Sequence, residues 1–192
     1  QDANGGWSTS KTPGVTGVAL TGLLRSGKVG PEDPLAARAL KYIEGLVNPK
    51  AKHIAGKDAR VQLQNYVTSI NVMALSAAKK ADRYEKIIGD AVTFLKKLQW
   101  DEGEGKSPRD DFYGGAGYGG KNNRPDLSNT AFMMEALHDT GLPANDPALQ
   151  RALVFVSRCQ NLKSEFNDQP WAGKVNDGGF VYTAANGGSS VA

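Results

Sequence analysis

The chain has 192 residues, a formal net charge of +3, 22% charged residues and 40% hydrophobic residues. This length corresponds to one large domain or to part of a longer protein, with enough residues to build a core. The small, scattered charge does not favour a nucleic-acid partner. No apolar run approaches the roughly 18 residues of a membrane-spanning helix, and no segment resembles a signal peptide.

The first third of the chain predicts a pair of helices behind a glycine loop. Gly5-Gly6-Trp7 is a glycine and aromatic loop. Small and apolar residues at helical spacing follow from Thr16 to a glycine stop at Gly27. A second helix starts at Asp33-Pro34, an N-cap with proline at the first helical position, and carries its apolar residues on one face. Residues 48–60 form a polar connection.

The same pair of helices recurs twice, with a step of 52 and then about 61 residues. In the first helices, Thr16 leads to Gly22-Leu23, Thr68 to Ala74-Leu75, and Thr130 to Ala136-Leu137. In the second helices, Ala39-Leu40 with Tyr42-Ile43 corresponds to Ala91-Val92 with Phe94-Leu95 and to Ala152-Leu153 with Phe155-Val156. Asp146-Pro147 also repeats the Asp33-Pro34 start. Such a period predicts stacked helical hairpins, here at residues 12–48, 62–99 and 126–161, before a glycine and aromatic loop over residues 162–192.

The two helices of each hairpin differ in kind. The first is small and apolar nearly all round, which suits a helix buried on most sides, whereas the second has one apolar stripe and a charged face. This contrast predicts an all-α fold with an inner and an outer layer of helices. Hairpins of this type stack as an open solenoid or close into an α/α ring around a cavity.

The third hairpin follows the most glycine-rich stretch of the chain, residues 112–120, and a basic link over residues 121–124. Pro125 fits just ahead of a helix, Asp126 or Ser128 can cap its first turn, and Gly141 can close its last turn. We expect the loop to deliver whatever it holds to the N-terminus of this helix.

Two motifs carry a resemblance to a known family. A glutamine precedes a glycine and aromatic loop three times, as Gln1 to Gly5-Gly6-Trp7, Gln99-Trp100 to Gly119-Gly120, and Gln160 to Gly178-Gly179-Phe180. This resembles the QW repeat of squalene and oxidosqualene cyclases, where the glutamine ties a helix end to the loop of its neighbour. Residues 125–131 are similar to the Asp-x-Asp-Asp-Thr-Ala motif of squalene–hopene cyclases and class II terpene cyclases. The resemblance covers residues 1–192 and implies the α/α toroid shared by terpene cyclases and protein prenyltransferase β subunits.

The motif departs from the family at its acid. The middle aspartate, which protonates an alkene or epoxide in the cyclases, is replaced by Ser128, and the next aspartate by Asn129. A hydroxyl cannot protonate an isolated alkene, so the usual protonation-initiated cyclisation is not expected. Asp126 remains at the first motif position as the catalytic candidate, although a helix N-cap is its favoured interpretation.

Prenyltransferase β subunits imply a zinc site made of Asp, Cys and His, which this sequence does not reproduce. Cys159, His53 and His138 lie on different parts of the repeat, without ligand-like spacing to one another. We therefore expect no metal and no cofactor. Cys159 sits in an apolar helical pattern, where a buried, inert thiol is favoured over a nucleophile.

Other patterns in the loops are weaker. Gly115-x-Gly117-x-x-Gly120 matches a dinucleotide-binding fingerprint by letters, but no strand precedes it and no helix opens within it. The acidic residues 101–104 and 110–111 match no calcium loop, which favours a solvated charge run. Six aromatic residues lie in glycine-rich loops and either plug the ends of the fold or line its cavity: Trp7, Tyr113, Tyr118, Trp171, Phe180 and Tyr182.

The resemblance implies a terpene-cyclase-like domain that offers a hydrophobic cavity to an isoprenoid or another apolar ligand, with enzymatic activity left open. We expect the ligand at the N-terminal ends of the inner helices, near Tyr118, Ser128 and Asn129, with Tyr113 and Trp7 as further contacts. The alternative is a non-catalytic scaffold that engages a partner protein through its loop end.

The repeat also bears on completeness. Residues 1–7 correspond to the tail of a repeat whose outer helix is missing, and residues 178–182 to a loop whose next inner helix is missing. Three hairpins are about half of a closed ring in the families that the chain resembles. We therefore expect the rest of a longer polypeptide, or another chain, to cover the terminal hairpins.

Overall fold

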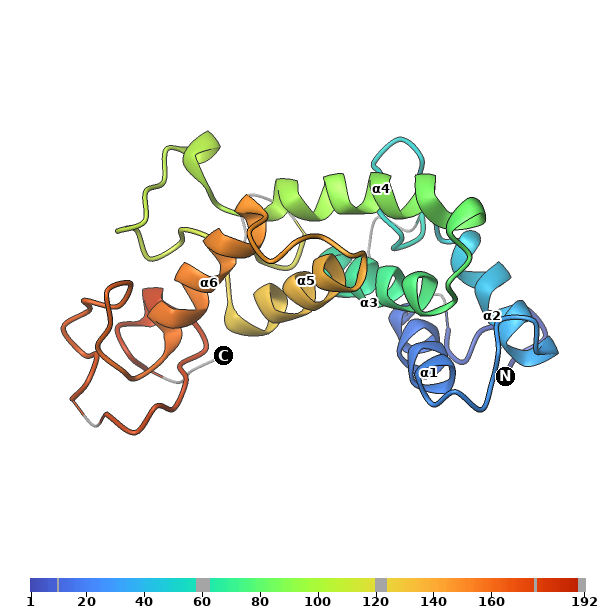
Figure 1. Cartoon of the computed structure of the whole chain (residues 1–192), viewed down its shortest axis with the longest axis horizontal. Coiled ribbons are helices and arrows are strands. Elements are labelled where there is room, and N and C mark those ends of the chain that lie inside the picture. The colour runs from blue at the N-terminus through green and yellow to red at the C-terminus, as the bar shows by residue number, and fades with distance from the viewer. Residues whose placement is uncertain (10, 58–62, 120–123, 175, 190–192) are drawn as a thin grey trace. The chain divides into compact units, whose positions relative to one another are not determined.

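The computed structural model describes residues 1–9, 11–57, 63–119, 124–174 and 176–189. Within these ranges the chain is all-helical, and its loops pair only through isolated β-bridges. The α-helices, labelled in Figure 1, are α1 (Gly14–Arg25), α2 (Pro34–Glu44), α3 (Gln64–Ala77), α4 (Ala81–Leu98), α5 (Leu127–Asp139) and α6 (Pro147–Cys159). Short 3₁₀ helices lie at η1 (Glu102–Glu104) and η2 (Ala184–Asn186). The predicted all-α class is confirmed.

The chain divides into two compact units. The first contains Gln1–Lys96 and Glu135–Leu142, and the second contains Lys97–Met134 and Pro143–Ala192. Helices α4 and α5 each contribute residues to both units. The closure of the three helix pairs into part of a ring stays a prediction.

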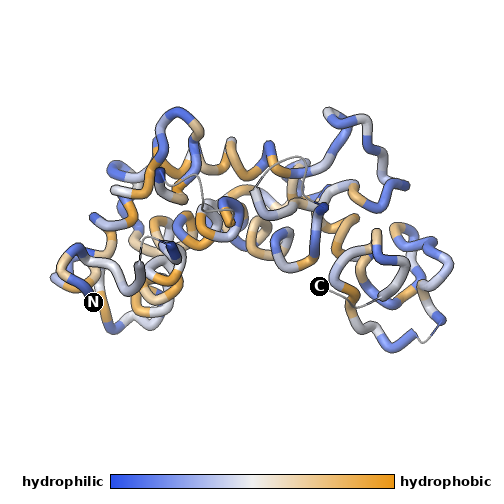
Figure 2. The backbone as a smooth tube through the Cα atoms, turned by 180° about the vertical axis from the view of Figure 1, so that it is seen from behind, coloured by the Kyte–Doolittle hydropathy of each residue, from blue (hydrophilic) through white to orange (hydrophobic). Residues whose placement is uncertain are grey.

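Helix α3 is buried over most of its length in the first unit and packs against α1. Figure 2 shows apolar colouring along both helices. A glycine of α1 makes this contact close: a Cβ atom at Gly17 would lie 2.4 Å from the Oδ1 atom of Asn71, whereas one at Gly14 would lie in ordinary contact, 3.4 Å from Val67. Glycine at position 17 therefore lets the two helices approach one another.

The second helix of a pair begins as the Asp-Pro motif predicts. The carboxylate of Asp33 accepts from the amide of Leu35 at 2.9 Å at the start of α2. At the start of α6, the carboxylate of Asp146 accepts from the amide of Ala148, also at 2.9 Å. Each aspartate satisfies one amide that the first helical turn leaves open, and the following proline needs no donor.

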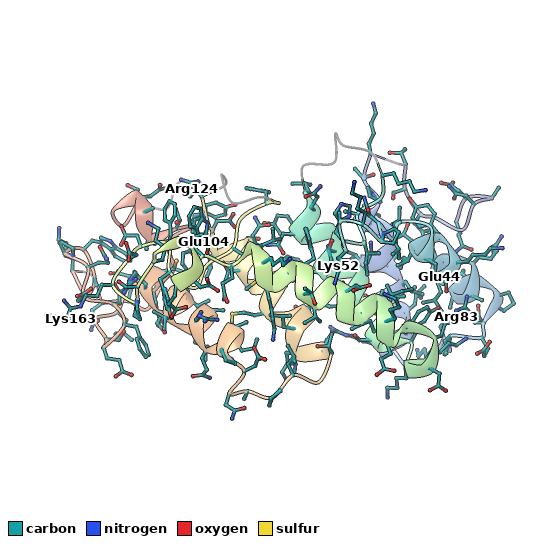
Figure 3. The ribbon with its side chains drawn as sticks, turned by 90° about the horizontal axis from the view of Figure 1, so that it is seen from above. Glu44, Lys52, Arg83, Glu104, Arg124 and Lys163 are labelled. Carbon is teal, nitrogen blue, oxygen red and sulfur yellow. The ribbon has the colours of Figure 1, made fainter. Side chains whose placement is uncertain are left out.

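Charged side chains join helices of the first unit at their exposed ends. Glu44 of α2 and Arg83 of α4 lie next to one another in Figure 3, with 2.6 Å between Oε1 and Nη2. The hydroxyl of buried Tyr84 donates to the same carboxylate at 2.9 Å, and burial raises the pKa of Tyr84. Arg25, near the end of α1, pairs with Glu135 and Asp139 of α5.

The second unit has its own apolar core around α6. Phe155 and Cys159 of α6 pack with Val181 and Ala184 from the C-terminal loop. Arg158 of the same helix is 2% exposed and donates to three backbone carbonyls, those of Pro108, Asp110 and Phe166. One buried guanidinium thus fixes two long loops on α6, which its rigid fork of donors permits.

Candidate functional site

An apolar groove of about 460 Å³ lies between the N-terminal ends of α1 and α3 in the first unit. Three of its lining side chains are unusually exposed for apolar residues: Val15 is 48% exposed, Val18 56% and Leu63 46%. The full lining consists of Lys11, Thr12, Pro13, Gly14, Val15, Val18, Leu63, Tyr66, Val67 and Ile70. Its volume falls in the range of about 300–1,000 Å³ that is usual for small-molecule sites.

The groove follows from the sequence of α1. Gly14 and Gly17 face α3, and the absence of a side chain at Gly17 brings the two helices together. Val15 and Val18 lie one turn apart on a neighbouring face, so they stay uncovered when the glycines are buried. The groove is closed on the α3 side by Tyr66, Val67 and Ile70. The lining residues include one charged side chain, Lys11, so the walls offer apolar contact and little else.

The predicted catalytic residue Asp126 is 1% exposed and lies directly before α5. One carboxylate oxygen accepts from the backbone amide of Asn129 at 2.8 Å, and the other accepts from the Nδ2 atom of Asn129 at 2.7 Å. This is the geometry of a helix N-cap, the interpretation that the sequence favoured. Ser128 is the second residue of α5 and is half-buried.

A pair of tyrosines lies close to the start of α5. The hydroxyls of Tyr118 and Tyr182 are 2.8 Å apart, and the amide of Leu127 donates to the Tyr182 carbonyl at 2.8 Å. The Arg124 guanidinium lies 5.8 Å from the centre of the Tyr182 ring and donates to Asn186. The C-terminal loop is thereby fastened to the first turn of α5 by Tyr182, a contact that the sequence did not predict.

Two further predicted ligand contacts, Tyr113 and Trp7, have surroundings of their own. Tyr113 is 6% exposed and its hydroxyl donates to Glu102 at 2.7 Å, while Arg151 pairs with the same carboxylate at 2.9 Å. This hydrogen bond from Tyr113 holds the pKa of Glu102 below its usual value. Trp7 belongs to the first unit and is half-buried there. Tyr113 is thus engaged by neighbours within the second unit.

Backbone amides of three loops bind the threonines that the repeat singled out. Each threonine is fully buried and lies within the first five residues of its helix. The amide of Trp7 donates to Thr16 Oγ1 at 2.9 Å, the amide of Ile54 to Thr68 Oγ1 at 3.2 Å, and the amide of Ala116 to Thr130 Oγ1 at 3.0 Å. A buried hydroxyl thus docks each loop on the helix that follows it, which explains why threonine recurs there.

The repeated glutamines bind loop carbonyls, and two of them also bind a helix. The Nε2 atom of Gln1 donates to the carbonyls of Gly5 and Leu35, both at 2.9 Å. The Nε2 atom of Gln99 donates to the carbonyls of Gly114 at 2.9 Å and Ala148 at 2.8 Å. The Nε2 atom of Gln160 donates to the Gly178 carbonyl at 3.1 Å. The pairing of Gln99 with Gly119-Gly120 is wrong, because its carbonyl partner is Gly114. Gly120 lies outside the described residues.

Glycine is required where the loops meet the second helix. Gly114 has φ +81°, and a Cβ atom there would lie 1.8 Å from the Arg151 carbonyl oxygen. Gly5 repeats this geometry with φ +88° and the Arg38 carbonyl oxygen at 2.3 Å. Only glycine tolerates both the left-handed backbone and the close approach. This geometry, rather than the mere count of glycines, identifies Gly114 as the counterpart of Gly5.

In the middle repeat, Lys52 stands at the position of Gly5 and Gly114 and also has a positive φ, +67°, while His53 stands at the position of Gly6 and Gly115. The ring of His53 stands edge-on to Phe94, with 5.4 Å between ring centres, and its Nδ1 atom accepts from the Ala55 amide at 3.3 Å. His53 is 5% exposed, and burial lowers the pKa of its imidazole. The sequence placed His53 in a polar connection and gave no sign of this packing role.

The remaining candidates are not arranged for chemistry. Cys159 is fully buried, and burial raises the pKa of its thiol to about 12, as expected for an inert cysteine. Among the described residues, no three His, Cys, Asp or Glu side chains are placed to hold a metal ion. None of the helices described combines the length and apolar character needed to cross a bilayer.

Comparisons with protein-family models, curated proteins and solved structures each found no match. The class of protein is therefore described from its fold alone. The chain is an all-helical protein built from repeated helix pairs, in which glycine loops are tied by threonine hydroxyls and glutamine amides.

Proposed function

We propose that this protein binds an apolar small molecule, of isoprenoid type, in the groove between α1 and α3. The observation that carries the proposal is the exposure of Val15, Val18 and Leu63 along one cavity of about 460 Å³. Apolar side chains left half exposed in a concave site favour a ligand that removes them from water. The groove also lies at the N-terminal ends of two inner-type helices, the end at which the sequence led us to expect a ligand.

Binding without catalysis is the better supported form of this function. Both carboxylate oxygens of Asp126 are engaged by Asn129, and a fully buried N-cap offers no acid to a ligand. Ser128 stands where the resembled motif has its acid, and a serine hydroxyl does not protonate an alkene. The proposal therefore assigns the domain a terpene-cyclase-like cavity but no protonation-initiated cyclisation.

The first test is native mass spectrometry of the purified chain, followed by titration with farnesol as a short isoprenoid. Farnesol is expected to bind, and the substitution Val18→Asp is expected to weaken binding about tenfold or more, because an apolar ligand would have to desolvate the new carboxylate. Leu153→Asp is the matched control, since Leu153 is also an apolar residue with 45% exposure on a helix but lies on α6.

Equal farnesol affinity for the two aspartate variants would place any binding outside the groove. No binding of farnesol to the unaltered chain, together with no co-purified apolar molecule, would exclude the proposed function.

A further inference from the structure

The fourth glycine loop, residues 178–181, has the same hydrogen-bond frame as the loop before α5. Phe180 forms an isolated bridge with Gln160, as Ala116 does with Gln99. The amide of Asn161 donates to the Gly179 carbonyl at 2.6 Å, as the amide of Trp100 does to the Gly115 carbonyl at 2.9 Å. Position by position, Gly178 therefore corresponds to Gly114, and Phe180 to Ala116.

The first difference lies at the backbone amide of Phe180. The corresponding amides of Trp7 and Ala116, and the amide of Ile54 in the middle repeat, each donate to a buried threonine. The Phe180 amide meets no acceptor within the described ranges, and Phe180 is 48% exposed. The loop thus presents a donor that its three counterparts use to hold a helix.

The second difference lies at the side chain of Gln160. Gln1 and Gln99 each donate to two carbonyls, and the second carbonyl belongs to the second residue of the next outer helix, Leu35 in α2 or Ala148 in α6. For Gln160, the part of the chain that the structure describes supplies only the Gly178 carbonyl. Both differences concern the same loop, and both leave a donor that the corresponding loops use to hold a pair of helices.

We propose that the 178–181 loop docks a helical hairpin of a partner polypeptide. The first helix of the partner offers a threonine or serine hydroxyl within its first five residues to the Phe180 amide. Its second helix offers a backbone carbonyl of its first turn to Gln160. Beside the loop, a cavity of about 310 Å³ gives room for side chains of the incoming helix, and its lining combines apolar residues with polar ones: Trp171, Phe180, Val181, Asn161, Lys174 and Asp177.

A second copy of this chain is a poor occupant, because its own threonines Thr16, Thr68 and Thr130 already bind loops of their own unit. The surface belongs to the second unit, whereas the α1–α3 groove belongs to the first. The inference therefore does not rest on the proposed ligand.

The test uses the chain's own third hairpin as the probe partner. A peptide with the sequence of residues 125–161, which carries Thr130 and Ala148, is fused behind residue 192 of the full chain through a flexible glycine–serine linker, so that its effective concentration is high. The matched control is the same fusion with Thr130→Val in the added copy only. Labelling with ¹⁵N-phenylalanine gives six amide signals in the unfused chain and eight in the fusion, since the added copy carries two phenylalanines of its own; one of the signals comes from Phe180.

Hydrogen exchange of the Phe180 amide is expected to slow at least about tenfold in the fusion and to return towards the rate of the unfused chain in the valine control. Within the fusion, Phe180→Pro in the host removes the donor, and Phe180→Leu keeps it. The proline variant should lose contact with the added hairpin, and the leucine variant should retain it. If the proline variant does not fold, the comparison of the threonine and valine fusions still tests the contact between the hydroxyl and the Phe180 amide.

Unchanged exchange at Phe180 in the fusion would overturn the proposal. Equal protection by the threonine and valine hairpins would overturn the hydroxyl contact. A Phe180 signal that shifts with concentration of the unfused chain would identify a second copy as the occupant and would overturn the assignment to a different partner.

Discussion

The side-chain amide of Gln99 donates to the backbone carbonyl of Ala148 at 2.8 Å and so joins the end of α4 to the first turn of α6. The same amide donates to Gly114 at 2.9 Å, and Gln99 is only 1% exposed. One buried side chain thus fixes a loop and the second helix of the following pair together.

Replacing Gln99 is expected to destabilise the protein more than replacing Gln160. Gln99→Ala removes two buried hydrogen bonds and leaves two carbonyls without a donor, which predicts a loss of about 2–3 kcal/mol in the free energy of unfolding. Gln160→Ala removes one bond at a half-buried position and should cost about 1 kcal/mol. Urea denaturation followed by circular dichroism measures both. Equal effects would contradict the double role of Gln99.

Two glycines with similar backbone angles should respond differently to alanine. Gly114 has φ +81°, and the Arg151 carbonyl oxygen blocks a side chain there. Gly141 has φ +82°, and a Cβ atom at this position would meet no other residue within 4 Å. Gly141→Ala should cost about 1 kcal/mol from the left-handed backbone alone, and Gly114→Ala more than about 3 kcal/mol because the loop must also move off α6. Thermal unfolding of the two variants gives the comparison. A similar melting temperature for both would show that the loop is not packed as described.

The thiol of Cys159 should react only when the protein opens. Its pKa is raised to about 12 by burial, so the reactive thiolate is scarce at pH 8, and the side chain is fully buried. Labelling by a disulfide reagent should be at least about a hundredfold slower in the folded chain than in urea. Because this is the only cysteine of the chain, the signal has one source. Rapid labelling without denaturant would place Cys159 on an accessible surface.

Stability should fall as the pH drops below about 6.5 because of His53. Burial lowers the pKa of His53 from its ordinary value of 6.5, so the unfolded chain takes up a proton at a higher pH than the folded chain does. Above pH 6.5 the imidazole is neutral in both states and does not change the stability. As the pH falls below 6.5, the unfolded chain gains the proton first, and the free energy of unfolding decreases. His53→Asn, which keeps an acceptor for the Ala55 amide, should reduce the pH dependence between pH 7 and pH 5.

His138→Asn is the control for this experiment, since the His138 side chain is 79% exposed. Denaturation midpoints across the pH series for the three proteins give the comparison. A pH dependence that is the same with and without His53 would show that the imidazole is not buried in its neutral form.

The repeat could be predicted from the sequence because the residues that mark it act on their near neighbours in the chain. The Asp-Pro starts at Asp33 and Asp146 specify helix caps, and the recurrence of Thr16, Thr68 and Thr130 identifies one position in three helices. Since these signals depend on neighbours close in the chain, they predicted the order and kind of the helices. The role of the threonine hydroxyls required the loops to be seen in place.

The candidate site was less predictable because it depends on which faces of the helices stay uncovered. Val15 and Val18 look like ordinary core residues in an apolar helix, and only the burial of Gly14 and Gly17 against α3 shows that the valines face outward. Similarly, Gln99 was paired with the wrong glycines of the loop, because the sequence does not show which glycine packs against the Arg151 carbonyl.

The central claim, that the groove between α1 and α3 holds an apolar ligand, is tested most directly by methyl NMR of the chain labelled at valine and leucine during titration with farnesol. The methyl signals of Val15, Val18 and Leu63 are predicted to shift together along one binding curve, while those of Leu153 stay in place. Farnesol shifts at Leu153, or shifts confined to the other apolar residues, with Val15 and Val18 unmoved at saturation, would contradict the claim.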